Sequence, residues 1–348
     1  MKDTDQTMPH TTPTLRTHPL TAQDAAVMAA IRAQVEPFKG KLQGVAAREP
    51  FNAIMERVAS PDGVTYHPDT VGGVSGLWCR PNDPRTGEAI LHLHGGWFNW
   101  GSAQAFRHLV GQIAARTGVE AFVPDYRLAP ENPFPAAVND VQTCYRGLVK
   151  RGKQRIAITG DSAGGNLALV LLSLATVASD NTPVGAVALS PVTDLTLTGQ
   201  SFEARADADP YFTQPQVARL IQSYLGGSDP RNPLASPLYG DLTGLPPIRI
   251  HVGEDEVLLD DSRRYFEGAA TAGVNIELDV WKGMAHGIVN GIGNLAASAE
   301  ALDAISKFLV GRLTADSIAR IQGAEPDCGK GEYRGNDLTS HGNVATAS

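Results

Sequence analysis

The chain has 348 residues, of which 42% are hydrophobic and 19% are charged, and its formal net charge at pH 7 is −8. This composition excludes a mainly disordered protein, a coiled coil and a collagen-like repeat, and the length suffices for a sizeable core. The acidic balance, without any Lys/Arg stripe, argues against nucleic acid as a partner.

The cysteines and the apolar runs indicate the cellular compartment of the protein. Cys79, Cys144 and Cys328 are far apart and odd in number, so they indicate neither a disulfide framework nor a Cys-x-x-Cys metal site. The first 20 residues are polar and lack the apolar segment of a signal peptide. The longest apolar-rich run, residues 167–178, is too short to cross a bilayer. We therefore expect a cytoplasmic protein with no membrane span.

In chain order, a mobile tail over residues 1–20 is expected to precede two helices, Ala22–Val35 and Pro50–Val58. From about residue 64, short apolar runs alternate with helical stretches. The expected strands are Gly73–Cys79, Ala89–His94, Ala121–Pro124, Arg155–Thr159, Ala186–Ser190, Ile248–Val252 and Ile276–Trp281. The expected helices are Ala103–Arg116, Pro135–Lys150, Ala163–Ala178, Gln214–Leu225, Asp261–Ala272 and Leu295–Val310. This alternation predicts an α/β fold with a mostly parallel sheet and helices on both faces.

One interval breaks the alternation. Residues 195–246 carry helical signals and many Pro, Asp and Gly residues, but no good strand. We expect this interval to form a helical cap together with residues 21–60. The domain would then run from 21 to 313, and residues 314–348, which have few large apolar side chains, would be a disordered C-terminal tail.

The strongest chemical signal is Gly160-Asp161-Ser162-Ala163-Gly164, between an expected strand and an expected helix. A G-x-S-x-G sequence in this setting is a nucleophile elbow, a sharp turn that exposes a strained serine. The glycines leave room where a Cβ would collide with the neighbouring chain. The helix N-terminus directs its free N–H groups at developing negative charge. Ser162 is therefore the candidate nucleophile.

A second glycine-rich segment, His94-Gly95-Gly96-Trp97, follows a buried strand. Consecutive glycines let backbone amides approach a reacting oxygen. With the N–H of Ala163, these amides can form an oxyanion hole.

The candidate base is His286, in a late loop after the strand Ile276–Trp281. In proteins with such a nucleophile elbow, the order along the chain is Ser, then Asp or Glu, then His. The acid must therefore lie between Ser162 and His286, and the loop from Gly253 to Asp261 is crowded with carboxylates. One of them must turn inward to orient the histidine.

The chain resembles the hormone-sensitive-lipase-like carboxylesterases of the α/β-hydrolase fold. The matching segments span roughly residues 60 to 310, and the resemblance rests on them together. They are His94–Trp97, Asp125–Glu131 with Phe134-Pro135-Ala136, Gly160–Gly165, the acid loop and the His286 loop.

The resemblance also assigns roles. Laid without a gap on the family's acid motif, G-x-x-D-P-L-x-D, the sequence places Glu256 at the catalytic position, with Asp255 as the alternative. This departs from the family's usual Asp. A second departure is Trp97 at the fourth position of H-G-G-G. In the family, amides of the third and fourth positions line the oxyanion hole, which implies that role for Gly96 and Trp97. Trp97 and Phe98 flank this loop and are candidate substrate-binding residues.

The implied activity is serine carboxylic-ester hydrolysis through an acyl-enzyme, on uncharged short- to medium-chain esters, without cofactor or metal. Members of the family often dimerise, so the resemblance allows a homodimer but leaves the oligomeric state open. One alternative is a lactone hydrolase with the same triad. Another is a non-catalytic receptor-like member that lacks a working triad, against which His286 argues.

Overall fold

A computed structural model describes residues 12–178 and 181–323. Within these ranges, nine strands form one sheet in the order β1-β9-β8-β7-β6-β4-β5-β3-β2. Neighbours from β1 through to β5 pair in parallel, whereas β3 is antiparallel to both β5 and β2. The predicted α/β class with a mostly parallel sheet is therefore confirmed.

The strands are β1 Thr14–His18, β2 Val64–Val71, β3 Val74–Pro81, β4 Glu88–Leu93, β5 Ala121–Pro124, β6 Arg155–Asp161, β7 Gly185–Leu189, β8 Ile248–Gly253 and β9 Ile276–Trp281. The α-helices are α1 Ala22–Val35, α2 Arg48–Met55, α3 Ala103–Thr117, α4 Ala136–Lys150, α5 Ala163–Ala178, α6 Ser201–Ala204, α7 Gln214–Leu225, α8 Leu259–Thr271 and α9 Ala296–Gly323. Short 3₁₀ turns are η1 Glu36–Phe38, η2 Val45–Ala47, η3 Pro237–Tyr239 and η4 Ile288–Gly291.

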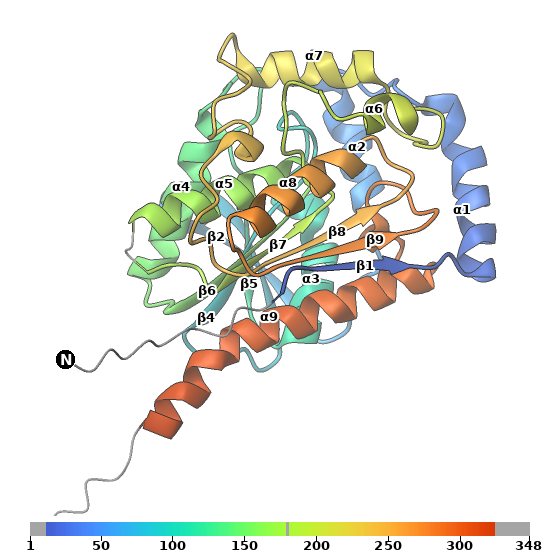
Figure 1. Ribbon diagram of the computed structural model, residues 1–348. Coiled ribbons are helices and arrows are strands. Elements are labelled where there is room, and N and C mark those ends of the chain that lie inside the picture. Colours follow the sequence, from blue (N-terminus) through green and yellow to red (C-terminus); the bar gives the residue numbers. More distant parts are fainter. Residues whose placement is uncertain (1–11, 179–180, 324–348) are drawn as a thin grey trace, which may run out of the picture. The chain divides into compact units, whose positions relative to one another are not determined.

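The central strands are continuous apolar runs because helices cover both faces of the sheet. Every residue of β4, β5 and β7 is buried. One core cluster contains side chains of α4, α5 and α8, and the other contains side chains of α3 and of α9 up to Leu313. Figure 1 shows these two helical layers above and below the sheet. The carboxyl ends of the parallel strands all meet at one edge, where the candidate site lies.

The N-terminal prediction is wrong in part. Thr14–His18 of the expected mobile tail forms β1, which pairs with β9 at the edge of the sheet. The edge strand β2 also has no counterpart among the expected strands. Both strands are largely polar and exposed, because only one edge of each is paired and little of either is covered. An apolar pattern therefore does not mark them.

The C-terminal prediction is wrong for residues 314–323. The helix α9 continues to Gly323, past the point after Leu313 at which the chain divides into two compact units. The rest of that predicted tail, residues 324–348, lies outside the described residues, as do residues 1–11. Among the described helices, none is long and apolar enough to cross a membrane.

The segments 21–60 and 195–246, which we call the cap, contact each other directly. The Gly40 N–H donates to the Tyr211 carbonyl at 3.0 Å, and Gln216 Nε2 donates to the Leu42 carbonyl at 2.7 Å. Arg32 in α1 also donates to the Ala208 carbonyl. In Figure 1 the cap helices α6 and α7 lie at the top of the view, beyond α5 and α8.

Candidate active site

The nucleophile elbow has the predicted steric form. Ser162 lies between the end of β6 and the start of α5 with φ +55°, a left-handed conformation that is uncommon for a non-glycine residue. A Cβ on Gly160 would overlap the Gly164 carbonyl, and one on Gly164 would overlap the Leu93 carbonyl. The Ser162 N–H donates to the Leu189 carbonyl at 2.7 Å, which holds the turn against β7.

The glycine loop after β4 is also wound into unusual backbone conformations. Gly96, Trp97 and Phe98 have φ of +119°, +53° and +61°. His94 braces the loop, because its Nδ1 lies 2.9 Å from the Gly95 carbonyl and its ring stacks on Tyr126 at 4.3 Å. Burial lowers the pKa of His94, which suits a neutral ring with a structural role.

The amides of this loop divide into two groups. The Gly95 N–H donates to Asp161 Oδ1 at 3.0 Å, so the prediction of Gly95 as an oxyanion donor is wrong. In the part of the chain that the structure describes, the amides of Gly96 and Trp97 have no hydrogen-bond acceptor. Ala163 begins α5, where amides lack intrahelical acceptors. Gly96, Trp97 and Ala163 are the donors still available to an oxyanion.

The structure places Glu256, rather than Asp255, against the candidate base. Glu256 Oε2 lies 2.7 Å from His286 Nδ1. The Glu256 side chain is buried, and its other oxygen accepts from Ser190 Oγ at 2.7 Å and from the Gly253 N–H at 2.5 Å. Asp255 instead pairs with Arg32, with an N–O distance of 2.7 Å.

The electrostatics of His286 favour its protonated form. Burial by itself would lower the pKa of the imidazole, but the charge and the hydrogen bond of Glu256 act in the opposite direction. The carboxylates of Asp209 and Asp161 add to that effect, and the pKa of His286 is raised overall. A base in this setting is well suited to take a proton from a serine hydroxyl, because the resulting imidazolium is stabilised.

The two aromatic candidates have different surroundings. Trp97 is buried and meets Phe212 of the cap edge-on at 5.3 Å, and Phe212 in turn meets the His286 ring at 5.1 Å. Phe98 stacks on Tyr224 of α7 at 3.7 Å within the core. The Phe98 contacts therefore indicate packing rather than substrate binding. Trp97 belongs to the same core cluster, but it contacts the Phe212 ring that packs on His286.

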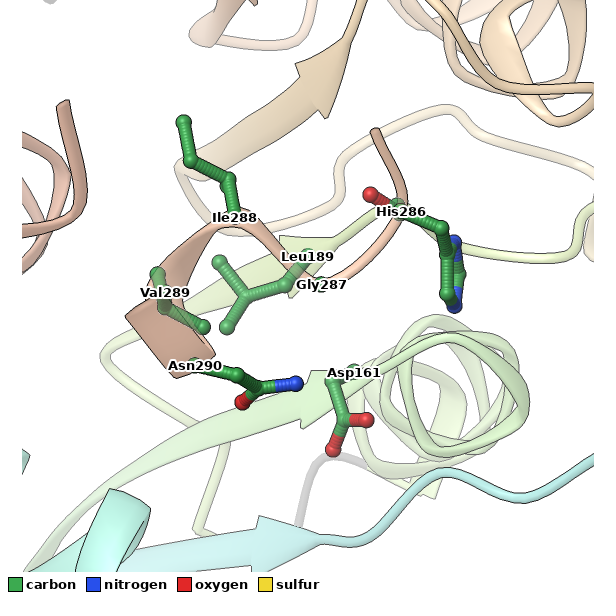
Figure 2. A pocket seen from close by; sticks show the side chains of 8 residues that line it. Asp161, Leu189, His286, Gly287, Ile288, Val289 and Asn290 are labelled. Atoms are coloured by element: carbon green, nitrogen blue, oxygen red, sulfur yellow. The ribbon is translucent and has the colours of Figure 1, made fainter. Parts of the chain in front are cut away.

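A small pocket lies next to His286 at the carboxyl ends of β6 and β7. Figure 2 shows the side chains that line it, among them His286, Asp161, Leu189 and the η4 residues Ile288 and Val289. Within the described ranges, no group of three or more His, Cys, Asp or Glu side chains is arranged to hold a metal ion.

The sequence did not reveal the part that Ser190 and Asp209 play near the site. Ser190 binds Glu256, and Asp209, in a polar loop of the cap, is fully buried. The aromatic side chain of Phe212 packs on His286. A serine at a strand end is a weak sequence signal, and Asp209 reaches the site only through tertiary packing.

Comparisons with known proteins identify the family. A family model described as alpha/beta hydrolase fold matches residues 90–290. The chain is similar to an acetyl-hydrolase of Streptomyces hygroscopicus, with 41% identity over 62% of this chain and 73% of that protein. It is also similar to an esterase of Acinetobacter venetianus, with 37% identity over 64% and 74% of the two chains. A putative acetyl-hydrolase of Mycobacterium tuberculosis is 32% identical over 72% and 82%.

Solved structures of esterases have the same fold. An esterase from the bacterial hormone-sensitive lipase family superposes with a TM-score of 0.79 at 34% identity, covering 85% of this chain and 99% of that one. A hormone-sensitive lipase from a metagenome library gives a TM-score of 0.78 at 35% identity, covering 82% and 98%.

Proposed function

The chain belongs to the hormone-sensitive-lipase-like carboxylesterases of the α/β-hydrolase fold, and we propose that it hydrolyses uncharged carboxylic esters through an acyl-enzyme formed on Ser162. The observation that carries the proposal is the pairing of buried Glu256 with His286 at 2.7 Å, in a chain whose elbow serine is held at φ +55°. A nucleophile, a base and an oriented acid are the three groups that acyl transfer requires.

In the proposed reaction, Ser162 Oγ attacks the ester carbonyl carbon while its proton passes to His286 Nε2. Glu256 holds the Nδ1 proton, so Nε2 is the nitrogen left to act as the base. The amides of Gly96, Trp97 and Ala163 donate to the oxygen that becomes negative. The tetrahedral intermediate collapses, the C–O bond breaks, and the alcohol leaves with the proton from His286. Water then attacks the acyl-enzyme with His286 as base, and the carboxylic acid departs.

The surroundings support small uncharged substrates. Phe212 packs its ring against His286, and Trp97 packs against Phe212, so aromatic side chains gather next to the candidate base. An aromatic wall next to the oxyanion loop favours short and medium acyl chains, because a bulky ring occupies a position where the family has glycine. The similar proteins named acetyl-hydrolases fit this range.

The test is hydrolysis of p-nitrophenyl esters from acetate to palmitate by the full chain, with Ser162→Ala as the control. We expect turnover to be highest between C2 and C8 and to fall by at least about 10³-fold in the variant. Circular dichroism should show both proteins folded. Undiminished turnover in Ser162→Ala would refute the mechanism.

A further inference from the structure

Asp209 of the cap occupies an unusual position for a charged side chain. It is fully buried, and its two oxygens accept three backbone N–H groups. Oδ1 accepts from Tyr211 at 2.8 Å and from Phe212 at 3.0 Å, within its own loop, whereas Oδ2 accepts from Val257 at 2.9 Å. A side chain that accepts at both oxygens and donates at neither has the hydrogen bonding of an ionised carboxylate.

These three bonds connect two segments that both contact the His286 ring. Phe212, held by Oδ1, packs its ring edge-on against His286 at 5.1 Å. Val257, held by Oδ2, directly follows Glu256, which binds His286 Nδ1. The carboxylate therefore connects the cap loop that packs on the base with the loop that carries its acid. A shift of either loop would change the orientation of the imidazole.

The charge of Asp209 also acts on the base. Three carboxylates raise the pKa of His286: Glu256 from the loop after β8, Asp209 from the cap and Asp161 from the end of β6. Glu256 makes the largest contribution of the three, because it also forms the hydrogen bond. Asp209 thus acts on the same ring through its charge. Burial raises the pKa of Asp209, whereas its three N–H bonds and the charge of His286 act in the opposite direction.

We propose that Asp209 is a positioning residue for the triad. By binding the Phe212 and Val257 amides, it holds the cap against the pair formed by Glu256 and His286. This inference rests on the proposed function of Ser162, Glu256 and His286. Asp209 touches neither the ester nor the reacting atoms, so its effect is on kcat through the orientation and basicity of His286. It also makes the cap part of the catalytic apparatus and not only a cover.

The test compares Asp209→Asn with Asp207→Asn. Asp207 is exposed, lies two residues away and forms no hydrogen bond with the part of the chain that the structure describes. Its variant therefore controls for the loss of one negative charge from the same loop. In Asp209→Asn, one side of the amide carries N–H donors and cannot accept from the facing backbone N–H. We expect kcat on p-nitrophenyl acetate to fall ~10-fold with little change in KM.

The pH profile of kcat/KM distinguishes a positioning role of Asp209 from a general loss of structure in the variant. Without the Asp209 charge, the imidazole loses its proton more easily, so the acid limb of kcat/KM should move by about 0.5 unit to lower pH. In Asp207→Asn, kcat and the acid limb should match the wild type. Titration with paraoxon, which labels only a working serine nucleophile, gives the fraction of active protein, so rates refer to folded enzyme. Asp209→Asn with wild-type kcat and acid limb would overturn the proposal.

A second variant keeps the test decisive if Asp209→Asn fails to fold. Phe212→Leu removes the ring that packs on His286 but leaves the Asp209 carboxylate, so kcat should fall while the acid limb stays in place. Wild-type kcat in Phe212→Leu would contradict the proposed linkage. If the wild-type protein itself neither turns over esters nor reacts with paraoxon, the proposed function fails; an active wild type with unaffected variants refutes only the role of Asp209.

Discussion

Replacement of Glu256 by Gln tests the assignment of the acid most directly. The change keeps the size of the side chain but converts one oxygen to an NH₂ group. In the structure, Oε1 accepts two donors, from Ser190 and Gly253, whereas Oε2 accepts one, from His286. The amide oxygen should therefore remain where two donors point, which leaves the NH₂ group facing His286 Nδ1.

That orientation selects the wrong tautomer of the base. His286 Nδ1 would have to accept a hydrogen bond, so the ring proton would move to Nε2, which could no longer take a proton from Ser162. In a serine triad, the corresponding change of the acid to its amide lowers kcat by ~10⁴-fold, which corresponds to about 5.4 kcal/mol of transition-state stabilisation. We expect Glu256→Gln to reduce kcat on p-nitrophenyl acetate by roughly 10³- to 10⁴-fold.

Asp255→Asn is the matched control. It makes the same chemical change one residue away, in a side chain that pairs with Arg32 rather than with His286. Its kcat should stay within ~5-fold of the wild type, because a partly exposed ion pair contributes little. Both variants should be checked for folding by circular dichroism and thermal unfolding. If Glu256→Gln keeps more than a tenth of the activity, or if Asp255→Asn loses as much activity as Glu256→Gln, then the assignment of Glu256 as the acid is wrong.

The remaining predictions concern pH, packing and chain length. Because Glu256 and its neighbours raise the pKa of His286, kcat/KM should rise with pH through a midpoint above 6.5, as the imidazole loses its proton; a midpoint below 6.5 would contradict this. Gly164→Ala places a methyl group against main-chain carbonyls and should lower the free energy of unfolding in urea by at least about 2 kcal/mol. Gly311→Ala, at a helix position with open space, should instead raise it by up to ~1 kcal/mol, and equal effects of the two would refute the steric argument. Trp97→Gly suits the positive φ and should raise the octanoate-to-acetate ratio of kcat/KM ~10-fold; an unchanged ratio would show that the indole does not limit acyl length.

The central strands and the elbow could be predicted because their signals are local. β5, β9, α5 and α7 have the expected bounds, since each is an uninterrupted apolar or amphipathic run ended by Gly, Pro or polar residues. The elbow is equally local, because Gly160 and Gly164 are needed wherever a strand turns sharply into a helix. In contrast, β1 is a polar five-residue segment that becomes a strand only because β9 offers it an unpaired edge.

By itself, the sequence of this protein determined the fold class, the candidate nucleophile and the candidate base, because periodicity, glycine placement and chain order are properties of the chain alone. Only the tertiary structure decided which carboxylate faces His286. Asp255 and Glu256 are adjacent and chemically alike, and the difference lies in their partners, Arg32 for one and Ser190 with His286 for the other. The same holds for Asp209, whose burial depends on amides contributed by loops far apart in sequence.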